Sequence, residues 1–293
     1  MELSVILFII IIGFLTGILA SLIGIGGGLI IVPSMIFFFN LLPSQATLIS
    51  SFVIIFISFS SSYKNYKLKR IDYETALTFF VICIPGSILG GLTSEIINPQ
   101  FLKFIFGITL IIYSIRGFYK SIKNIKSDRI NNTTSKINNN DNLVLSNNSS
   151  DHIFNRHIVD SDGSEYKYNV EFGSEMIIIF IGGYFAGLLG LGGGIIFVPL
   201  LYNFLGLPFI IVVATSMFVI FLNSIIIVSS RIIFQIINSE LDYSILLDFG
   251  LPLSIASIIG AYFGSSLTKK IGPNYLSIIF WLIAIFASFR MMI

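Results

Sequence analysis

Long apolar runs, separated by short polar connections, dominate this chain. No Asp, Glu, Lys, Arg or His occurs in residues 3–63 or in residues 176–230. A helix that spans a bilayer needs about 20 apolar residues. The runs therefore predict six spanning helices, at 46–63, 75–94, 100–119, 209–230, 244–267 and 275–293. Ahead of each group of three lies a pair of apolar segments interrupted by glycines, 3–23 with 29–42 and 176–189 with 195–206.

The second segment of each pair is too short to cross a membrane. Its 12 to 14 residues reach only about 18 to 21 Å as a helix, against a hydrocarbon core of about 30 Å. We therefore expect each pair to be a broken or re-entrant helix with a glycine-rich tip.

The glycine-rich segment occurs twice. GILASLIGIGGGLIIVP at residues 17–33 returns as GYFAGLLGLGGGIIFVP at residues 183–199. Further glycines repeat later in each half: Gly86 and Gly90 correspond to Gly260 and Gly264. The duplication predicts a first transmembrane repeat at 1–122 and a second at 174–293. Between them, residues 123–173 are polar and rich in Asn, which predicts a disordered linker.

Composition and charge agree with a membrane protein. The chain is 55% hydrophobic and 11% charged, with a mean hydropathy of +0.93. Basic residues cluster at 64–70, at 120–129 and at 269–270, and such loops face the cytoplasm. This places the linker inside and both termini outside, so the halves are related by inversion. The predicted fold is an all-α polytopic membrane protein of two inverted repeats, each a glycine-tipped helix pair plus three transmembrane helices.

The tips offer uncharged groups that bind anions. Their glycines leave backbone N–H groups uncovered, and the half-helix that follows each tip presents its positive N-terminal end. Irregular backbone at membrane depth survives only inside protein or along a polar cavity. The candidate binding residues in the tips are Gly24, Gly26, Gly27, Gly28, Gly190, Gly192, Gly193 and Gly194.

Hydroxyl groups follow each tip and extend the candidate site. Ser50 and Ser51 come after the first tip, and Thr215 and Ser216 after the second. They either complete the ligand shell of an anion or bond back to carbonyls of their own helices. For the outer glycine pairs, of which Gly13 and Gly17 are one, we favour helix packing over a role in binding.

Inverted repeats with interrupted helices are typical of secondary transporters, which bind substrate where the repeats meet. A transporter of small anions is therefore the favoured function. A channel-like anion pore and a membrane scaffold or accessory protein without transport are the alternatives. No nucleophile with a nearby base can be assembled from the spans, so we expect no enzyme. We also expect no cofactor, no metal site and no nucleic-acid partner.

The repeated segments, Ala20 to Pro33 and Ala186 to Pro199, together with the Thr215–Ser216 pair, resemble the sulfite exporter TauE/SafE family of membrane permeases. The resemblance covers both halves but not the linker. It implies transport of sulfite or an organosulfonate, often outward. An integral multi-pass protein of this kind fits either the plasma membrane or an organelle membrane, and is compatible with a homo-oligomer.

Overall fold

A computed structural model describes residues 3–105, 107–108, 111, 153–171, 175–238 and 243–267. In this part of the chain, five helices are long and apolar enough to cross a membrane. The protein is thus an integral, multi-pass, largely helical membrane protein, as the apolar runs predicted. The predicted span at 275–293 and most of the one at 100–119 lie outside the described residues.

The first half begins with α1 (Leu3–Ile23), which ends at the first tip. After the tip comes the short helix α2 (Gly28–Phe39), of 12 residues. Two long helices follow, α3 (Pro43–Lys67) and α4 (Tyr73–Ile96). Asp72 precedes α4 and caps it, because its side chain accepts a hydrogen bond from the Thr75 N–H.

The second half repeats this order. α6 (Glu175–Leu189) ends at the second tip, and α7 (Gly194–Pro199) follows it as a short helix, continued by the π-helical turn η1 (Leu200–Phe204). The long helix α8 runs over Phe209–Ile237. A further helix is built from α9 (Tyr243–Ile245), the π-helical turn η2 (Leu246–Gly250) and α10 (Leu251–Leu267). Both breaks expected in the glycine-tipped pairs are therefore present, whereas the inverted orientation of the halves stays a prediction.

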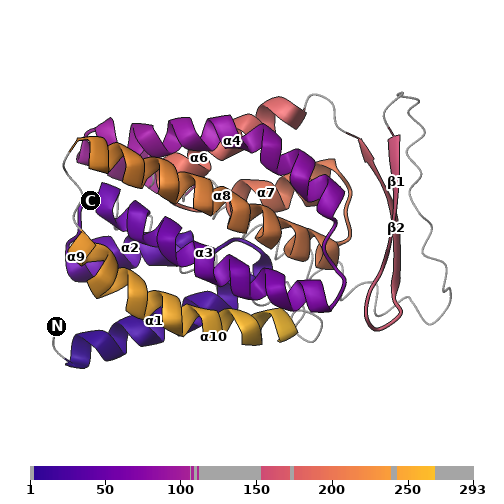
Figure 1. The fold of residues 1–293 in the computed structure, drawn as a ribbon, viewed down its shortest axis with the longest axis horizontal. Coiled ribbons are helices and arrows are strands. Elements are labelled where there is room, and N and C mark those ends of the chain that lie inside the picture. Colours follow the sequence, from indigo (N-terminus) through magenta and orange to yellow (C-terminus); the bar gives the residue numbers. More distant parts are fainter. Residues whose placement is uncertain are drawn as a thin grey trace.

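The two halves pack by exchanging their outer helices (Figure 1). α1 of the first half packs against α10 of the second, and α6 of the second half packs against α4 of the first. Between these outer pairs, α3 and α8 lie against each other along the middle of the molecule. Neither half is an independent body, because each outer helix finds its main partner in the other half.

Glycines make these crossings close. A Cβ atom on Gly17 of α1 would overlap the Ser257 carbonyl of α10. On the other side of the molecule, a Cβ on Gly90 of α4 would overlap the Tyr184 carbonyl of α6. Gly183 and Gly187 of α6, the second outer pair, lie equally close to the Cys83 and Ser87 carbonyls of α4. These contacts of helix backbones confirm the packing role expected of the outer glycine pairs, which is the role small residues play between membrane helices.

Replacing Gly90 with alanine is expected to destabilise the protein by about 1 to 3 kcal/mol, because the new methyl group overpacks a backbone contact. The adjacent change Gly91→Ala is the matched control. A Cβ at Gly91 would lie 3.3 Å from the Ser230 hydroxyl, an adjustable side chain. Thermal unfolding in detergent should show a lower midpoint for Gly90→Ala and an unchanged or higher one for Gly91→Ala. Equal effects would contradict the close crossing.

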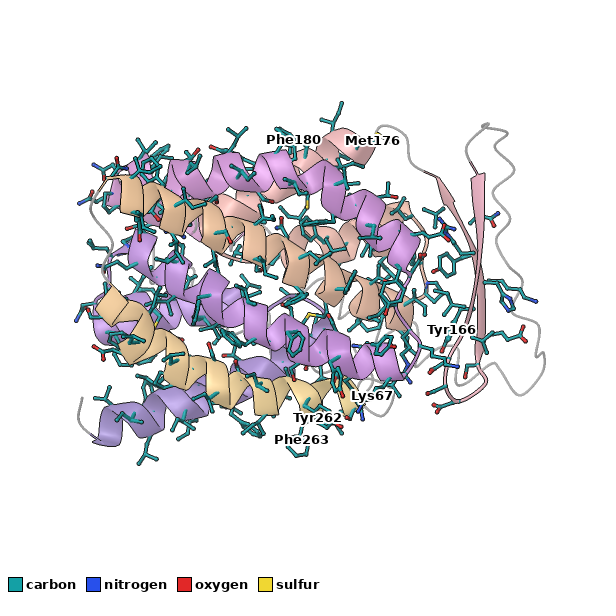
Figure 2. The ribbon with its side chains drawn as sticks, viewed as in Figure 1. Lys67, Tyr166, Met176, Phe180, Tyr262 and Phe263 are labelled. Atoms are coloured by element: carbon teal, nitrogen blue, oxygen red, sulfur yellow. The ribbon has the colours of Figure 1, made fainter. Side chains whose placement is uncertain are left out.

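Large apolar side chains cover the outside of the bundle. Figure 2 shows Met176 and Phe180 on α6, and Phe263 on α10, pointing away from the other helices. Phe263 is 55% exposed and Met176 is 43% exposed. Since lipid tails are as apolar as these side chains, a bilayer is the solvent that suits this surface.

A β-hairpin occupies the end of the segment that was predicted to be a disordered linker. Strands β1 (Ile153–Val159) and β2 (Glu165–Glu171) pair in antiparallel fashion and lie at one end of the bundle (Figure 1). Alternating apolar residues explain the difference, because Tyr168 and Val170 point to one face and are buried there. The disorder predicted for the rest of the linker concerns residues outside the described ones.

The helix α8 also differs from its prediction. The predicted span ends at residue 230, but α8 continues to Ile237 and Arg231 is completely buried. Arg231 ends the apolar run in the sequence, but it remains inside α8 because Glu95 pairs with it. Asp248, an acidic residue within the predicted span at 244–267, lies exposed in η2.

Candidate functional site

The two glycine tips meet halfway along the central helices. Ile54 lies near the middle of α3, and Ile220 near the middle of α8. A Cβ on Gly26 of the first tip would lie 3.3 Å from Ile220 and 3.5 Å from Ile54. A Cβ on Gly192 of the second tip would lie 2.9 Å from Ile54 and 3.0 Å from Ile220. Both tips are therefore held between the same two isoleucines.

The tips share one backbone conformation. Gly27 precedes α2 with φ of 91°, and Gly193 precedes α7 with φ of 94°. This left-handed region is strained for residues with a side chain, so the chain needs glycine at these two positions. Residues 24–29 and 190–195 are all buried.

Backbone amides at both tips lack acceptors. Within the described part of the chain, the N–H groups of residues 26–29 and 192–195 donate no hydrogen bond. Buried amides are nearly always paired with protein, with ordered water or with a bound group. Each run opens a helix, where N–H groups and the helix dipole favour negative charge. Eight buried donors thus lie at the place that the sequence singled out.

The tips also contact each other directly. A Cβ on Gly28 of the first tip would lie 2.7 Å from the Gly190 carbonyl oxygen of the second. Conversely, a Cβ on Gly194 would overlap the backbone of Ile25. The glycines are therefore required for the two tips to approach, besides leaving their amides open.

Two of the predicted hydroxyls bind the tips across the repeats. Ser50 on α3 donates to the Gly190 carbonyl at 2.7 Å, and Ser216 on α8 donates to the Gly24 carbonyl at 3.1 Å. Ser50 and Ser216 are related by the same offset of 166 positions that relates Gly17 to Gly183. Each half therefore holds the tip of the other half with an equivalent serine.

The other two predicted hydroxyls are engaged elsewhere. Ser51 donates to the Thr47 carbonyl of its own helix at 2.9 Å, which is the local alternative weighed for these residues. Thr215 accepts a hydrogen bond of 3.1 Å from the Asp72 N–H at the start of α4. The structure therefore joins the eight tip glycines with Ser50 and Ser216, but not with the Ser51 and Thr215 hydroxyls.

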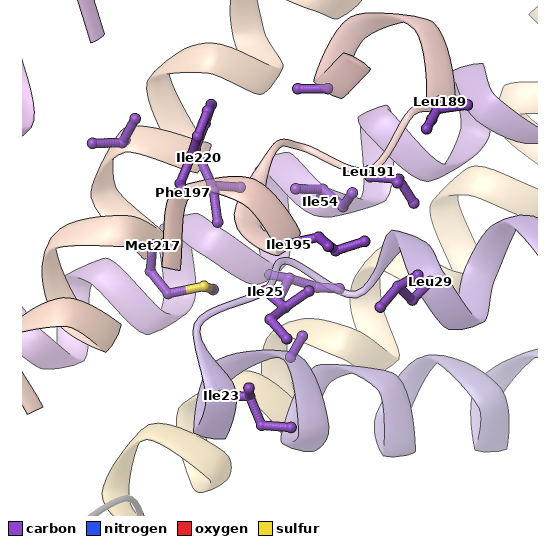
Figure 3. Close-up of a cluster of buried hydrophobic side chains, with 14 of the residues drawn as sticks. Ile23, Ile25, Leu29, Ile54, Leu189, Leu191, Ile195, Phe197, Met217 and Ile220 are labelled. Atoms are coloured by element: carbon purple, nitrogen blue, oxygen red, sulfur yellow. The ribbon is translucent and has the colours of Figure 1, made fainter. Parts of the chain in front are cut away.

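Apolar side chains fill the space around the tips. Figure 3 shows Ile25, Leu29, Leu191 and Ile195 gathered at the two loops. All four are at most 5% exposed. A small apolar cavity beside the second tip is lined by Phe185, Ala186, Leu189, Leu191, Gly193, Ile195 and Ile196. The tips are closed to the outside in this conformation.

Two buried polar side chains at this depth lie outside the predicted set of binding residues: Asn223 on α8 is a weaker candidate from the sequence, and Thr16 on α1 was not singled out. Thr16 on α1 lies close to Gly27, whose Cβ would be 2.8 Å from the Thr16 methyl carbon. The Thr16 hydroxyl and the Asn223 amide nitrogen have no hydrogen-bond partner in the described part of the molecule. Thr16 stands alone in an apolar run, so no pattern could single it out.

A buried ion pair lies at the end of the bundle away from the hairpin. Arg231 on α8 donates from Nε to the Glu95 carboxylate on α4 at 2.6 Å. The Arg231 side chain is 0% exposed and the Glu95 side chain 9% exposed. Glu95 follows the predicted span at 75–94 and Arg231 follows the one at 209–230, and no local pattern shows that the ends of α4 and α8 meet.

The hairpin is held at the opposite end by buried polar groups. Arg70, in the loop between α3 and α4, pairs with Asp160 of the hairpin turn at 2.9 Å. Tyr168 on β2 donates to the Asp72 carboxylate at 2.8 Å. Burial and the neighbouring Asp72 carboxylate raise the pKa of Tyr168 above its ordinary value, so its hydroxyl keeps the proton that it donates.

The long apolar helices, the two broken helix pairs and the buried tips between them define a multi-pass membrane transporter rather than an enzyme. The chain belongs to the sulfite exporter TauE/SafE family, whose family model matches residues 9–291. This confirms the resemblance found in the repeated segments.

Two curated relatives have names of the same class. The probable membrane transporter protein YunE of Bacillus subtilis (strain 168) is 33% identical over 223 residues, which is 74% of this chain and 74% of YunE. The probable membrane transporter protein MJ0441 of Methanocaldococcus jannaschii is 29% identical over 283 residues, covering 92% of this chain and 89% of the relative. No solved structure matches this chain.

Proposed function

We propose that this protein is a secondary transporter of small oxyanions and that its substrate is sulfite or an organosulfonate, moved outward. The observation that carries the proposal is the set of buried backbone amides without acceptors at residues 26–29 and 192–195. An oxyanion between the tips accepts hydrogen bonds from these amides and needs no buried lysine or arginine there. Sulfur as the central atom is favoured by membership of the sulfite exporter family.

The packing of the tips favours a carrier over a channel-like pore. Ile54 and Ile220 lie against both tips and are buried. An anion reaches the amides only when these side chains and the tips move apart, so each transported ion requires a conformational change. Because Ser50 and Ser216 tie each tip to the opposite half, such a movement changes both tips together.

Purified protein in liposomes tests the proposal through uptake of labelled sulfite. We expect saturable flux, with competition by organosulfonates stronger than that by chloride. A pore would give currents far above carrier turnover with little saturation. Well-folded protein that moves no anion would contradict the proposed function and leave a scaffold or accessory role.

Removing either hydroxyl that holds a tip should slow transport. Ser50→Ala leaves the buried Gly190 carbonyl without its donor, and Ser216→Ala does the same to Gly24. A buried group left unpaired costs about 1 to 3 kcal/mol, so we expect flux to fall about tenfold in each variant. Ser51→Ala is the matched control, since that hydroxyl bonds only within α3. Equal flux in all three variants would count against the role of the two serines.

A further inference from the structure

Arg231 is a buried charged residue that has no role in the anion site proposed at the tips. Its guanidinium is fixed from three sides: Nε donates to Glu95, one terminal nitrogen donates to the Thr47 hydroxyl at 3.0 Å, and the other to the Ser44 carbonyl at 2.7 Å. Ser44 and Thr47 belong to the first turns of α3, so the guanidinium joins the ends of α3, α4 and α8.

The fold does not require a charge at this position. The offset of 166 positions that relates the tips relates Arg231 to Asn65. Asn65 is also buried, and its amide donates to the Ser61 carbonyl of its own helix at 3.0 Å. A neutral residue thus fills the equivalent place in the other half. Since apolar residues often replace a buried ion pair without loss of stability, a charge inside a membrane bundle indicates a function.

One residue connects Arg231 to the second tip. Thr47 accepts from Arg231 through its hydroxyl, and its backbone packs against the tip, since a Cβ on Gly190 would lie 2.7 Å from the Thr47 Cα. The same Gly190 receives the hydrogen bond from Ser50. The guanidinium therefore lies beside the second tip, on the side where α4 and α8 end.

We propose that Arg231 forms a second binding site for the transported oxyanion, on the route between the second tip and that end of the bundle. Glu95 occupies the site in the conformation described here, and its carboxylate stands in for the oxyanion. The proposal rests on the proposed function. A guanidinium fork binds oxyanions through charge-assisted N–H donors. Here Nε and one terminal nitrogen of Arg231 both contact the same oxygen of the Glu95 carboxylate.

The burial of the pair shows which partner leaves. Thr47 and Ser44 hold Arg231 in place, and its side chain is 0% exposed. Glu95 is 9% exposed, and its second oxygen accepts from Gln235 at 3.1 Å. An arriving anion displaces the Glu95 carboxylate toward the surface of the bundle, while Arg231 remains beside the second tip. Two anions therefore compete for one cation, and Glu95 lowers the apparent affinity for substrate.

Neutral substitutions test this competition in liposomes. Glu95→Gln keeps a hydrogen-bond acceptor for Arg231 but removes the competing charge, so the sulfite concentration at half-maximal flux should fall about threefold to tenfold. The double variant Arg231→Gln, Glu95→Gln leaves no unpaired buried charge and should raise that concentration about tenfold or more. Arg231→Lys keeps the charge but loses the fork, and should lie between wild type and the double variant.

A partly exposed ion pair provides the matched control. Arg156 of the hairpin pairs with Glu74 of α4, whose side chain is 74% exposed. The double variant Arg156→Gln, Glu74→Gln makes the same change of charge and should leave half-saturation unchanged. Thermal stabilisation of the detergent-solubilised variants by sulfite gives a second readout of binding that does not depend on flux.

The outcomes separate the two proposals. If wild-type protein transports sulfite and the Arg231→Gln, Glu95→Gln variant keeps its half-saturation and its stabilisation by sulfite, Arg231 is structural and the second site is wrong. If wild-type protein neither transports nor is stabilised by any anion, the proposed function fails and the second site fails with it. Should the double variant not fold, a half-saturation unchanged in both Glu95→Gln and Arg231→Lys would overturn the second site equally.

Discussion

Replacing Gly194 with alanine is expected to lower anion flux about a hundredfold, because small displacements of groups that position a reacting or bound atom have effects of this size. The backbone of Gly194 is not in the left-handed region, so alanine brings no strain of its own. Its methyl group would instead overlap the Ile25 carbonyl of the first tip. The two tips must separate, and their amides can no longer act on one anion.

The control for this variant is Gly206→Asn. Gly206 has φ of 66°, a conformation that Asn tolerates, and open space within 4 Å of its Cβ position. Flux measured in liposomes should be close to wild type for Gly206→Asn. The amount of folded Gly194→Ala protein after purification separates loss of transport from loss of folding. Wild-type flux in folded Gly194→Ala would show that contact between the tips is not needed for transport.

Replacing Arg70 with alanine is expected to release the hairpin from the bundle. Arg70 and Asp160 are 4% and 0% exposed, and removal of one partner of a buried ion pair costs about 3 to 5 kcal/mol. The bundle itself does not depend on this pair, because its helices pack through α1, α3, α4, α6, α8 and α10. The cost therefore falls on the docking of β1 and β2.

Hydrogen exchange measures this release. Amides of residues 153–171 should exchange about a hundredfold faster in Arg70→Ala, which corresponds to a loss of about 3 kcal/mol. Asp162 is the matched control: it lies 3.9 Å from the same guanidinium but is 59% exposed, so Asp162→Asn should change exchange little. Unchanged protection in Arg70→Ala would mean that Tyr168 and the loop backbone hold the hairpin without the ion pair.

The spanning helices and the position of the tips were predictable because both depend on local properties. A segment that crosses the bilayer has to satisfy its backbone groups within one helix, so a long apolar run without charge predicts α1, α3 or α8 directly. Three glycines in succession, repeated in the second half, break such a run. Gly27 and Gly193 have the same backbone conformation, which shows that the repeated glycine-rich sequence forms the same tip in both halves.

The end of α8 was predicted wrongly, and the docking of the hairpin on the bundle was missed, for one physical reason. Polar residues in a sequence suggest solvent, but a polar group can be buried if another part of the chain supplies its partner. Arg231 forms an ion pair with Glu95, and Arg70 forms one with Asp160. The two residues of each pair lie far apart in the sequence, so no local pattern predicts the pairing.

The sequence by itself thus determined the class of protein, the helical spans and the paired glycine tips. Only the tertiary structure decided what the polar side chains do. Ser50 and Ser51 are neighbours, yet Ser51 bonds its own helix while Ser50 reaches Gly190, 140 positions away. Successive side chains on a helix point about 100° apart, so the crossing of α3 with the second tip selects one serine of the pair. The exchange of outer helices between the halves creates that crossing, and with it the site.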